Sequence, residues 1–172
     1  IEMWGGTIGG NLVILNAFTM NAFKKLVDSW DWHRDGTLRI KTPKPGITRP
    51  HYRPPDPTTD YKSAHGRGKA LDLQIPPHVA YGKPGHIPWK KKLIRAAQLA
   101  GFNAFGLGTG TVHIDPANAR WWAYFNSKAC GRKCLVPKIN AGVNIWDRVP
   151  PEFTPGGKYR GKPPDYRNSS IA

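Results

Sequence analysis

The spacing of apolar side chains predicts an amphipathic helix near the start of the chain. Over residues 16–32, apolar side chains recur at every fourth position, at Phe18, Ala22, Leu26 and Trp30. This spacing is typical of one buried helix face. Asn16 stands just before the pattern and is a suitable N-cap.

A second helix is predicted over residues 88–100. Pro88 suits the first turn of a helix, and Gly101 suits the position just after its end. The apolar face of this helix comprises Trp89, Leu93, Ala96, Ala97 and Ala100. The basic residues are expected to face solvent, and they are Lys90, Lys91, Lys92 and Arg95.

Short runs of apolar and alternating residues predict strands between and after these helices. They span residues 37–42, 69–75, 102–107 and 111–115. Pro116 is expected to begin a short helix that carries Trp121 and Trp122. Together these elements predict an α+β fold, in which helices flank a small antiparallel sheet.

Proline and glycine set the ends of the chain apart from its middle. Residues 43–62 hold six prolines and predict a stiff loop, which is either a wall of a substrate groove or a surface excursion. We expect an N-terminal arm over residues 1–15, one domain over 16–135 and an extended, basic, Pro/Gly-rich tail over 136–172. The tail is expected to wrap the domain or to dock on a neighbouring virion or cell-envelope protein.

The charge balance predicts a polyanionic partner. The chain has 26 Lys and Arg against 11 Asp and Glu, a net charge of +15. Nucleic acid and an anionic bacterial cell wall both fit this charge. No helix-turn-helix, zinc-finger or RNA-binding signature is present, and no apolar run has the length of a membrane span. The two cysteines, Cys130 and Cys134, predict a local disulfide or free thiols rather than a metal site.

Two histidines and an aspartate form a candidate metal site. Asp72 and His113 lie in the predicted strands 69–75 and 111–115, and antiparallel pairing of these strands would place them side by side. His65 would reach them from the preceding loop, where glycines permit a tight backbone path. Two imidazoles and one carboxylate suit a catalytic zinc, because three protein ligands leave a fourth position for water. The predicted chemistry is hydrolysis of an amide.

The segment around the first histidine resembles a known signature. Residues Ser63, His65, Gly68, Ala70 and Asp72 match the Ser-x-His-x-x-Gly-x-Ala-x-Asp pattern of the zinc D-alanyl-D-alanine carboxypeptidases. That family belongs to a group that also contains lysostaphin-type peptidases and hedgehog domains. The Val-His-Ile-Asp segment at 112–115 is similar to the one that carries the last zinc ligand in murein endopeptidases. The resemblance covers roughly residues 16–126 and implies the hedgehog/D-Ala-D-Ala peptidase fold.

The resemblance implies roles for individual residues. It makes His65, Asp72 and His113 the zinc ligands, and it makes Ser63 a residue that orients substrate. Many members carry a glutamate base three residues before the last ligand, whereas this chain has Gly110 there. The murein endopeptidases also lack this glutamate. Our candidates for the base are Asp115, which is alternatively a partner of a ligand imidazole or a cap before Pro116, and its rivals His86 and His78.

A second departure concerns recognition of a substrate carboxylate. Relatives often carry an arginine after the first strand, a position without arginine in this chain. The residues that could substitute are Lys44, Arg49, Arg53 and Arg67, of which Arg67 lies within the signature itself. This departure favours an endopeptidase over a carboxypeptidase.

These observations lead to three hypotheses. The first is a zinc-dependent peptidoglycan peptidase that acts in the periplasm or cell wall, such as a phage endolysin or a virion-associated lysin. The second is a non-catalytic zinc-binding assembly module of the same fold, and Gly110 motivates it. Nucleic-acid binding driven by charge ranks third, because no motif supports it.

Overall fold

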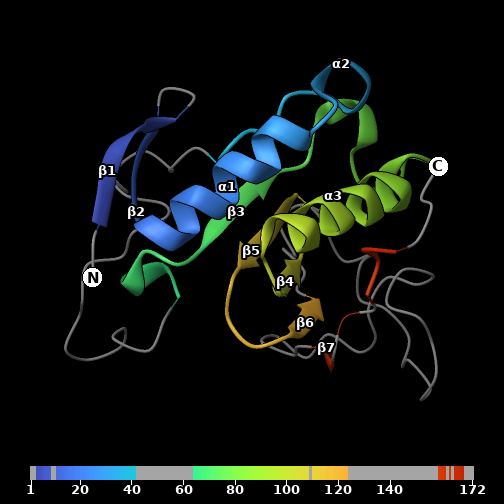
Figure 1. The fold of residues 1–172 in the computed structure, drawn as a ribbon. Coiled ribbons are helices and arrows are strands. Elements are labelled where there is room, and N and C mark those ends of the chain that lie inside the picture. The colour runs from blue at the N-terminus through green and yellow to red at the C-terminus, as the bar shows by residue number, and fades with distance from the viewer. Residues whose placement is uncertain are drawn as a thin grey trace.

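The computed structural model has seven strands and two long helices among the residues that it describes (Figure 1). The structure describes residues 3–8, 11–41, 64–108, 110–123, 159–161, 163 and 165–168. The proline-rich segment 43–62 with Lys44, Arg49 and Arg53, then Ser63, Cys130, Cys134 and most of the tail lie outside the described residues.

The main sheet has the strand order β3-β5-β4-β6-β7. Its strands are β3 (Leu71–Gln74), β4 (Ala104–Leu107), β5 (Thr111–Asp115), β6 (Arg120–Ala123) and β7 (Tyr159–Gly161). All neighbours pair antiparallel except β4 and β6, which run parallel. The α+β class is therefore confirmed, but the sheet is mixed rather than antiparallel throughout.

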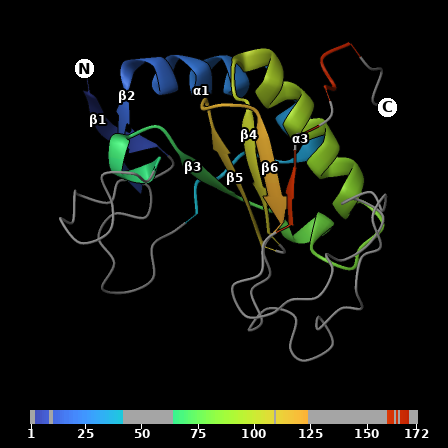
Figure 2. The same cartoon turned by 90° about the horizontal axis from the view of Figure 1, so that it is seen from below.

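Two helices cover one face of this sheet (Figure 2). They are α1 (Ala17–Ser29) and α3 (His86–Ala100), and the short α2 (Trp32–Asp35) follows α1. Two 3-10 turns, η1 (His65–Arg67) and η2 (Pro77–Val79), flank β3. A hairpin of β1 (Met3–Ile8) and β2 (Asn11–Asn16) precedes α1. In this stretch the sequence suggests an irregular arm with a short strand near Leu12 to Leu15; β2 confirms the strand, whereas β1 was not predicted. Among the helices of the described part of the chain, none is long and apolar enough to cross a membrane.

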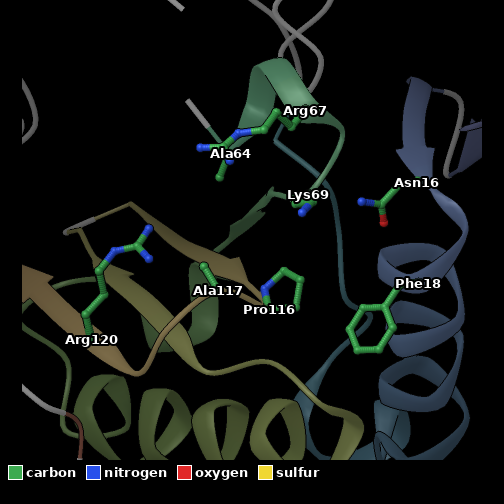
Figure 3. Close-up of a pocket in the computed structure, with 8 residues that line it drawn as sticks. All are labelled: Asn16, Phe18, Ala64, Arg67, Lys69, Pro116, Ala117 and Arg120. Carbon is green, nitrogen blue, oxygen red and sulfur yellow. The ribbon is translucent and has the colours of Figure 1, made fainter. Parts of the chain in front are cut away.

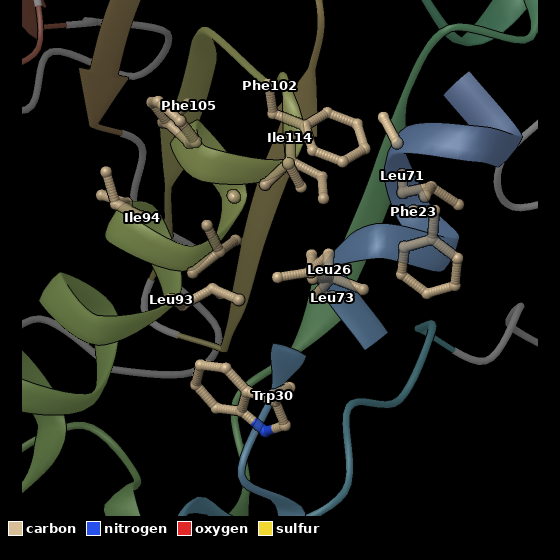
Figure 4. Packing of buried hydrophobic residues seen from close by; sticks show 14 of the residues in the cluster. Phe23, Leu26, Trp30, Leu71, Leu73, Leu93, Ile94, Phe102, Phe105 and Ile114 are labelled. Atoms are coloured by element: carbon tan, nitrogen blue, oxygen red, sulfur yellow. The ribbon is translucent and has the colours of Figure 1, made fainter. Parts of the chain in front are cut away.

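The hydrophobic core lies between the sheet and the two helices (Figure 4). Each long helix contributes one buried stripe, and alternate residues of β3 and β5 face it. The fully buried members include Leu26, Leu71, Leu73, Leu93, Ile94, Phe102, Phe105, Val112 and Ile114. Full burial of such a side chain stabilises the fold by about 1.5–3 kcal/mol relative to exposure. This core fixes which face of β3 and β5 is left for polar residues.

The first predicted helix is confirmed, together with its cap. Asn16 Oδ1 accepts a hydrogen bond from the Thr19 amide at 2.8 Å, which satisfies one of the unpaired donors at the helix start. Leu26 is buried as the periodicity predicted. Phe18 is the exception, because it is 63% exposed.

The second predicted helix is also confirmed, but one of its lysines is not in solvent. Gly101 ends α3 with a left-handed φ of 110°, which costs a glycine little. Lys90 is buried, and its Nζ donates to the Gly108 carbonyl at 2.6 Å. Burial lowers the pKa of this ammonium group to about 7. The prediction that Lys90 faces solvent is therefore wrong.

Two further predictions from local pattern were incorrect or only partly met. Residues 116–119 form bends rather than a helix, and the tryptophans that follow belong to β6. Of the strand expected over residues 37–42, the described residues 37–41 form one bridge, between Ile40 and Leu73. The chain returns as β7 at the edge of the sheet, and Tyr166 packs against the core.

Candidate metal centre

The register between β3 and β5 brings two of the predicted ligands together. Asp72 lies directly opposite His113 in this antiparallel pair. The neighbouring residues Val112 and Ile114 are buried in the core beneath the helices. Because successive side chains on a strand point to opposite faces, Asp72 and His113 lie on the face away from α1 and α3. This placement confirms the sequence prediction for the pair.

The third predicted ligand comes from the turn that precedes β3. His65 begins η1, and the Gly68 amide donates to the His65 carbonyl at 3.1 Å. Gly68 has a φ of 64°, a left-handed conformation that side chains disfavour. The Lys69 amide then donates to the Ala64 carbonyl at 2.8 Å, which closes the turn. The tight path predicted for this loop therefore exists, and it directs the buried His65 ring toward His113.

Three ligand atoms form a small triangle. His65 Nε2 lies 3.1 Å from His113 Nδ1, which in turn lies 3.1 Å from Asp72 Oδ1. The third side, from His65 Nε2 to Asp72 Oδ1, is 3.5 Å. In a tetrahedral site with metal–ligand bonds of about 2.0–2.1 Å, neighbouring ligand atoms are roughly 3.3–3.4 Å apart. The triangle therefore has the size that one metal ion requires, and this buried group could hold such an ion.

Asp115 fixes the orientation of the His113 ring. Its Oδ2 lies 2.9 Å from His113 Nε2, on the side of the ring opposite the triangle. A carboxylate only accepts hydrogen bonds, so Nε2 donates to Asp115, and an ion bound in the triangle would take the lone pair of Nδ1 in place of the contact that Nδ1 makes with Asp72 Oδ1. Asp115 is itself held by Arg120 Nη2 at 2.9 Å and by the Ala117 amide at 2.9 Å. A carboxylate behind a ligand imidazole is a recurrent arrangement in metal sites.

Interactions within this group shift the pKa values of Asp72, Asp115 and His113 so that the charged form of each is favoured. Burial alone would raise the pKa of Asp72, but hydrogen bonds with His113 and His65 lower it well below its usual value. Asp115 behaves similarly: burial opposes ionisation, while the hydrogen bonds from His113 and Ala117 lower its pKa. Burial would lower the pKa of His113, but its bonds to the two carboxylates raise it. Both aspartates are therefore ionised. Their negative charges favour a positive charge nearby, either on His113 or on an ion in the triangle.

The three candidates for a general base lie in different surroundings. Asp115 is fully buried and accepts from three donors, an arrangement that suits the alternative role of a partner of the ligand imidazole. His86 lies at the start of α3, on the covered face, where its Nδ1 lies 3.0 Å from the Val79 carbonyl. Burial lowers the pKa of His86 to about 4. His78 is exposed in η2, which follows β3 in the chain, and it is not part of the metal group.

A cavity of about 420 Å³ lies between η1, the turn that carries His65, and the residues that hold Asp115 (Figure 3). Its walls come from η1, from the bend after β5, from β6 and from the start of α1. The lining residues are Asn16, Phe18, Ala64, Arg67, Lys69, Pro116, Ala117 and Arg120. Arg67, the candidate for substrate binding, is among them. Ser63 immediately precedes this lining in sequence but lies outside the described residues.

Sequence reasoning missed Arg120 as a residue of the site. Its position falls within the short helix that the sequence predicts from Pro116 onward, which suggests no partner for its side chain. In the structure it joins the cavity to the metal group through Asp115. The only local signal was an arginine five residues after a buried aspartate, which is too common to be informative.

Comparison with known proteins adds no relative. No family model matches the chain, and no curated protein or solved structure matches it either. The inference about function therefore depends on the site and on the sequence signature.

Proposed function

We propose that this protein is a zinc-dependent peptidase that cleaves peptide stems or crosslinks of bacterial peptidoglycan. The observation that carries the proposal is the triangle of His65 Nε2, Asp72 Oδ1 and His113 Nδ1, with sides of 3.1–3.5 Å. Two imidazoles and a carboxylate suit zinc better than calcium or magnesium, which prefer oxygen ligands. Zinc in such a site supplies Lewis acidity, which activates water and polarises a peptide carbonyl.

The residues of the chain have separate tasks in this proposal. His65, Asp72 and His113 hold the ion and, as three ligands, leave one position for water or substrate. Asp115 keeps the His113 ring in the tautomer that presents Nδ1. Arg67 lies at the cavity beside the metal group and is suited to binding part of the substrate.

The sequence signature supports the choice of peptidoglycan as substrate. The signature over residues 63–72 and the segment at 112–115 are similar to those of murein-cleaving zinc peptidases. The order helix, strand, helix and paired strands that follows from α1 onward is compatible with a hedgehog/D-Ala-D-Ala peptidase-like domain. A net charge of +15 would draw the protein to an anionic wall, in the periplasm, at the cell surface or from a virion.

Digestion of purified cell walls tests the proposal. We expect the full chain to release new amino groups from walls, to lose this activity on chelation and to regain it with zinc. His113→Ala removes one ligand and is expected to abolish release. His33→Ala is the matched control, because His33 is exposed on α2 and stacks on Trp32. Equal release by the chelated protein or by His113→Ala would refute a zinc peptidase.

A non-catalytic zinc-binding module is the second candidate. Gly110 is exposed and provides no side chain at the position where many relatives carry a glutamate. Asp115, the nearest alternative, is held by three donors. Stoichiometric zinc without wall digestion at any pH would favour this module over the peptidase.

A further inference from the structure

One oxygen of the Asp115 carboxylate is shared by two donors. His113 Nε2 and Arg120 Nη2 each lie 2.9 Å from Asp115 Oδ2. The Ala117 amide donates to the other oxygen, Oδ1, also at 2.9 Å. A fully buried carboxylate with partners on both oxygens has little freedom to turn. The position of Oδ2 relative to His113 therefore depends on where Arg120 is held.

The sheet brings Arg120 to this carboxylate across an intervening strand. Ala104 of β4 is the register partner of Asp115 on β5 and also of Arg120 on β6. Register partners in neighbouring strands have their side chains on the same face of the sheet. Neighbouring strands are about 4.8 Å apart, so β5 and β6 lie roughly 9–10 Å apart, and the long arginine side chain can span this distance. Ala104 carries only a methyl group, which leaves room for the ion pair above β4.

The backbone fixes both partners of this ion pair. The Asn103 amide donates to the Asp115 carbonyl at 3.1 Å, and the Arg120 amide donates to the Asn103 carbonyl at 3.4 Å. The bend over residues 116–119 therefore begins and ends next to Asn103, the residue before β4. An ion pair with both backbones held in this way keeps a defined geometry, unlike a pair of mobile surface side chains.

We propose that Arg120 is a positioning residue of the metal centre, which acts through Asp115 to hold the His113 ring so that Nδ1 faces the ion. That an ion binds there rests on the proposed function. The shared oxygen Oδ2 transmits the position of Arg120 to His113. Residues that orient a ligand histidine in this indirect way are common in metal sites. The metal centre therefore extends to β6, a strand that carries none of the three proposed ligands.

The zinc affinity of the full chain tests this assignment. Arg120→Gln is expected to weaken zinc binding about tenfold, measured by competition with a chromophoric chelator, which is the lower end of the range for residues that orient a ligand. Arg120→Lys keeps a positive charge near Asp115 and is expected to recover part of the loss. The Arg120 side chain is 44% exposed, so glutamine at this position still reaches water and both variants are expected to fold.

A second arginine provides the matched control. Arg34 Nη2 lies 3.1 Å from Oδ2 of the buried Asp35, and the Arg34 side chain is exposed. Arg34→Gln removes the same kind of ion pair from α2, which carries no proposed ligand. It is expected to change zinc affinity less than about twofold. Equal losses in Arg34→Gln and Arg120→Gln would overturn the assignment, because they would reflect only a missing ion pair.

A double-mutant cycle shows whether Arg120 acts through Asp115. Arg120→Gln is expected to weaken zinc binding about tenfold in the parent, but less than about threefold in a chain that already carries Asp115→Asn. The second effect is smaller because the carboxylate that transmits it is absent. Losses that multiply in full would mean that Arg120 acts by another route, and the proposal would then be wrong.

The orientation of His113 is also measurable without any metal. In the zinc-free chain, the proton on His113 Nε2 is expected to give a downfield NMR resonance that exchanges slowly with water, because Asp115 holds it in a buried hydrogen bond. Arg120→Gln is expected to broaden this resonance through faster exchange, whereas Arg34→Gln leaves it unchanged. A resonance that is equally sharp in Arg120→Gln and in the parent would contradict the positioning role.

Failure of this proposal and failure of the proposed function give different results. A chain whose zinc affinity and His113 resonance respond to Arg120→Gln, but which never digests walls, keeps the positioning residue and loses the peptidase. A chain that digests walls with zinc, and binds zinc equally well with Arg120→Gln, keeps the peptidase and loses the positioning residue. A chain that binds no zinc loses the peptidase, and the His113 resonance alone then decides whether Arg120 orients the ring.

Discussion

Replacing Asp115 with asparagine is the sharpest test of how the metal group is built. Asparagine has nearly the same shape, and its Oδ1 still accepts the Ala117 amide hydrogen bond. What changes is Oδ2, which accepts from His113 Nε2 and from Arg120, both at 2.9 Å. An amide nitrogen at that position would face two donors. His113 then gains by moving its proton to Nδ1, the atom that faces the metal position.

The expected loss follows from this change of tautomer. Loss of a hydrogen-bonded carboxylate behind a ligand imidazole typically lowers metal affinity about 10–100-fold, or roughly 1.4–2.7 kcal/mol. We expect the same range for zinc binding to Asp115→Asn. Competition with a chromophoric chelator measures it directly, and cobalt absorption reports whether the remaining ligands still bind.

A second buried aspartate provides the control. Asp35 is buried like Asp115, and its Oδ1 pairs with Lys92 Nζ at 2.9 Å. Asp35 is the last residue of α2, and Trp89 and Lys92 of α3 donate to its carbonyl and its carboxylate. Asp35→Asn is expected to lower the unfolding free energy but to change zinc affinity less than about threefold, because additivity holds for distant sites. If folded Asp115→Asn binds zinc as tightly as the parent, the assigned role of Asp115 is wrong.

Three further outcomes follow from the structure. Lys90 has a pKa of about 7 in the folded protein, against 10.5 for an ordinary lysine, so the unfolded chain holds the additional proton between these pH values. Stability therefore rises with pH over this range, and Lys90→Met is expected to remove that rise in urea titrations while leaving the Gly108 carbonyl without its donor. Leu93→Ala is expected to cost about 2–5 kcal/mol of unfolding free energy, and Leu99→Ala, on the exposed side of the same helix, less than about 0.5 kcal/mol. Chelation is expected to lower the Tm of the parent but not that of His65→Ala, in thermal melts with and without zinc.

Local signals were sufficient for the elements that the metal group depends on. The Asn16 cap and the Gly101 stop are each contained within a few neighbouring residues, and both helices formed where these signals stand. The pairing of Asp72 with His113 followed from alternation, since one face of each strand had to be apolar. These features need no knowledge of distant contacts.

The predictions that were wrong or missing concern residues whose contacts lie far away in the sequence. Lys90 is buried, and its ammonium group donates to the carbonyl of Gly108, which is eighteen residues away in sequence. The tryptophans after Pro116 form a strand because β4 offers a parallel edge, although a proline followed by aromatic residues also suits a helix. The function of Arg120 depends on that same strand. Long-range pairing therefore decided each case that local pattern left open.

The pairing of β7 with β6 determines what a break in the backbone between these two strands would do. Trp121, Trp122 and Ala123 of β6 pair with Gly161, Arg160 and Tyr159, so both ends of the intervening segment are fixed to one sheet. All three proposed metal ligands precede that segment. A break in the backbone there would leave a C-terminal piece whose described residues are held by strand pairing, by the hydrogen bond from the Tyr166 amide to Gln98 Oε1 and by the packing of Tyr166 against the core. The protein is thus suited to fragment complementation, with the larger fragment carrying the whole ligand set.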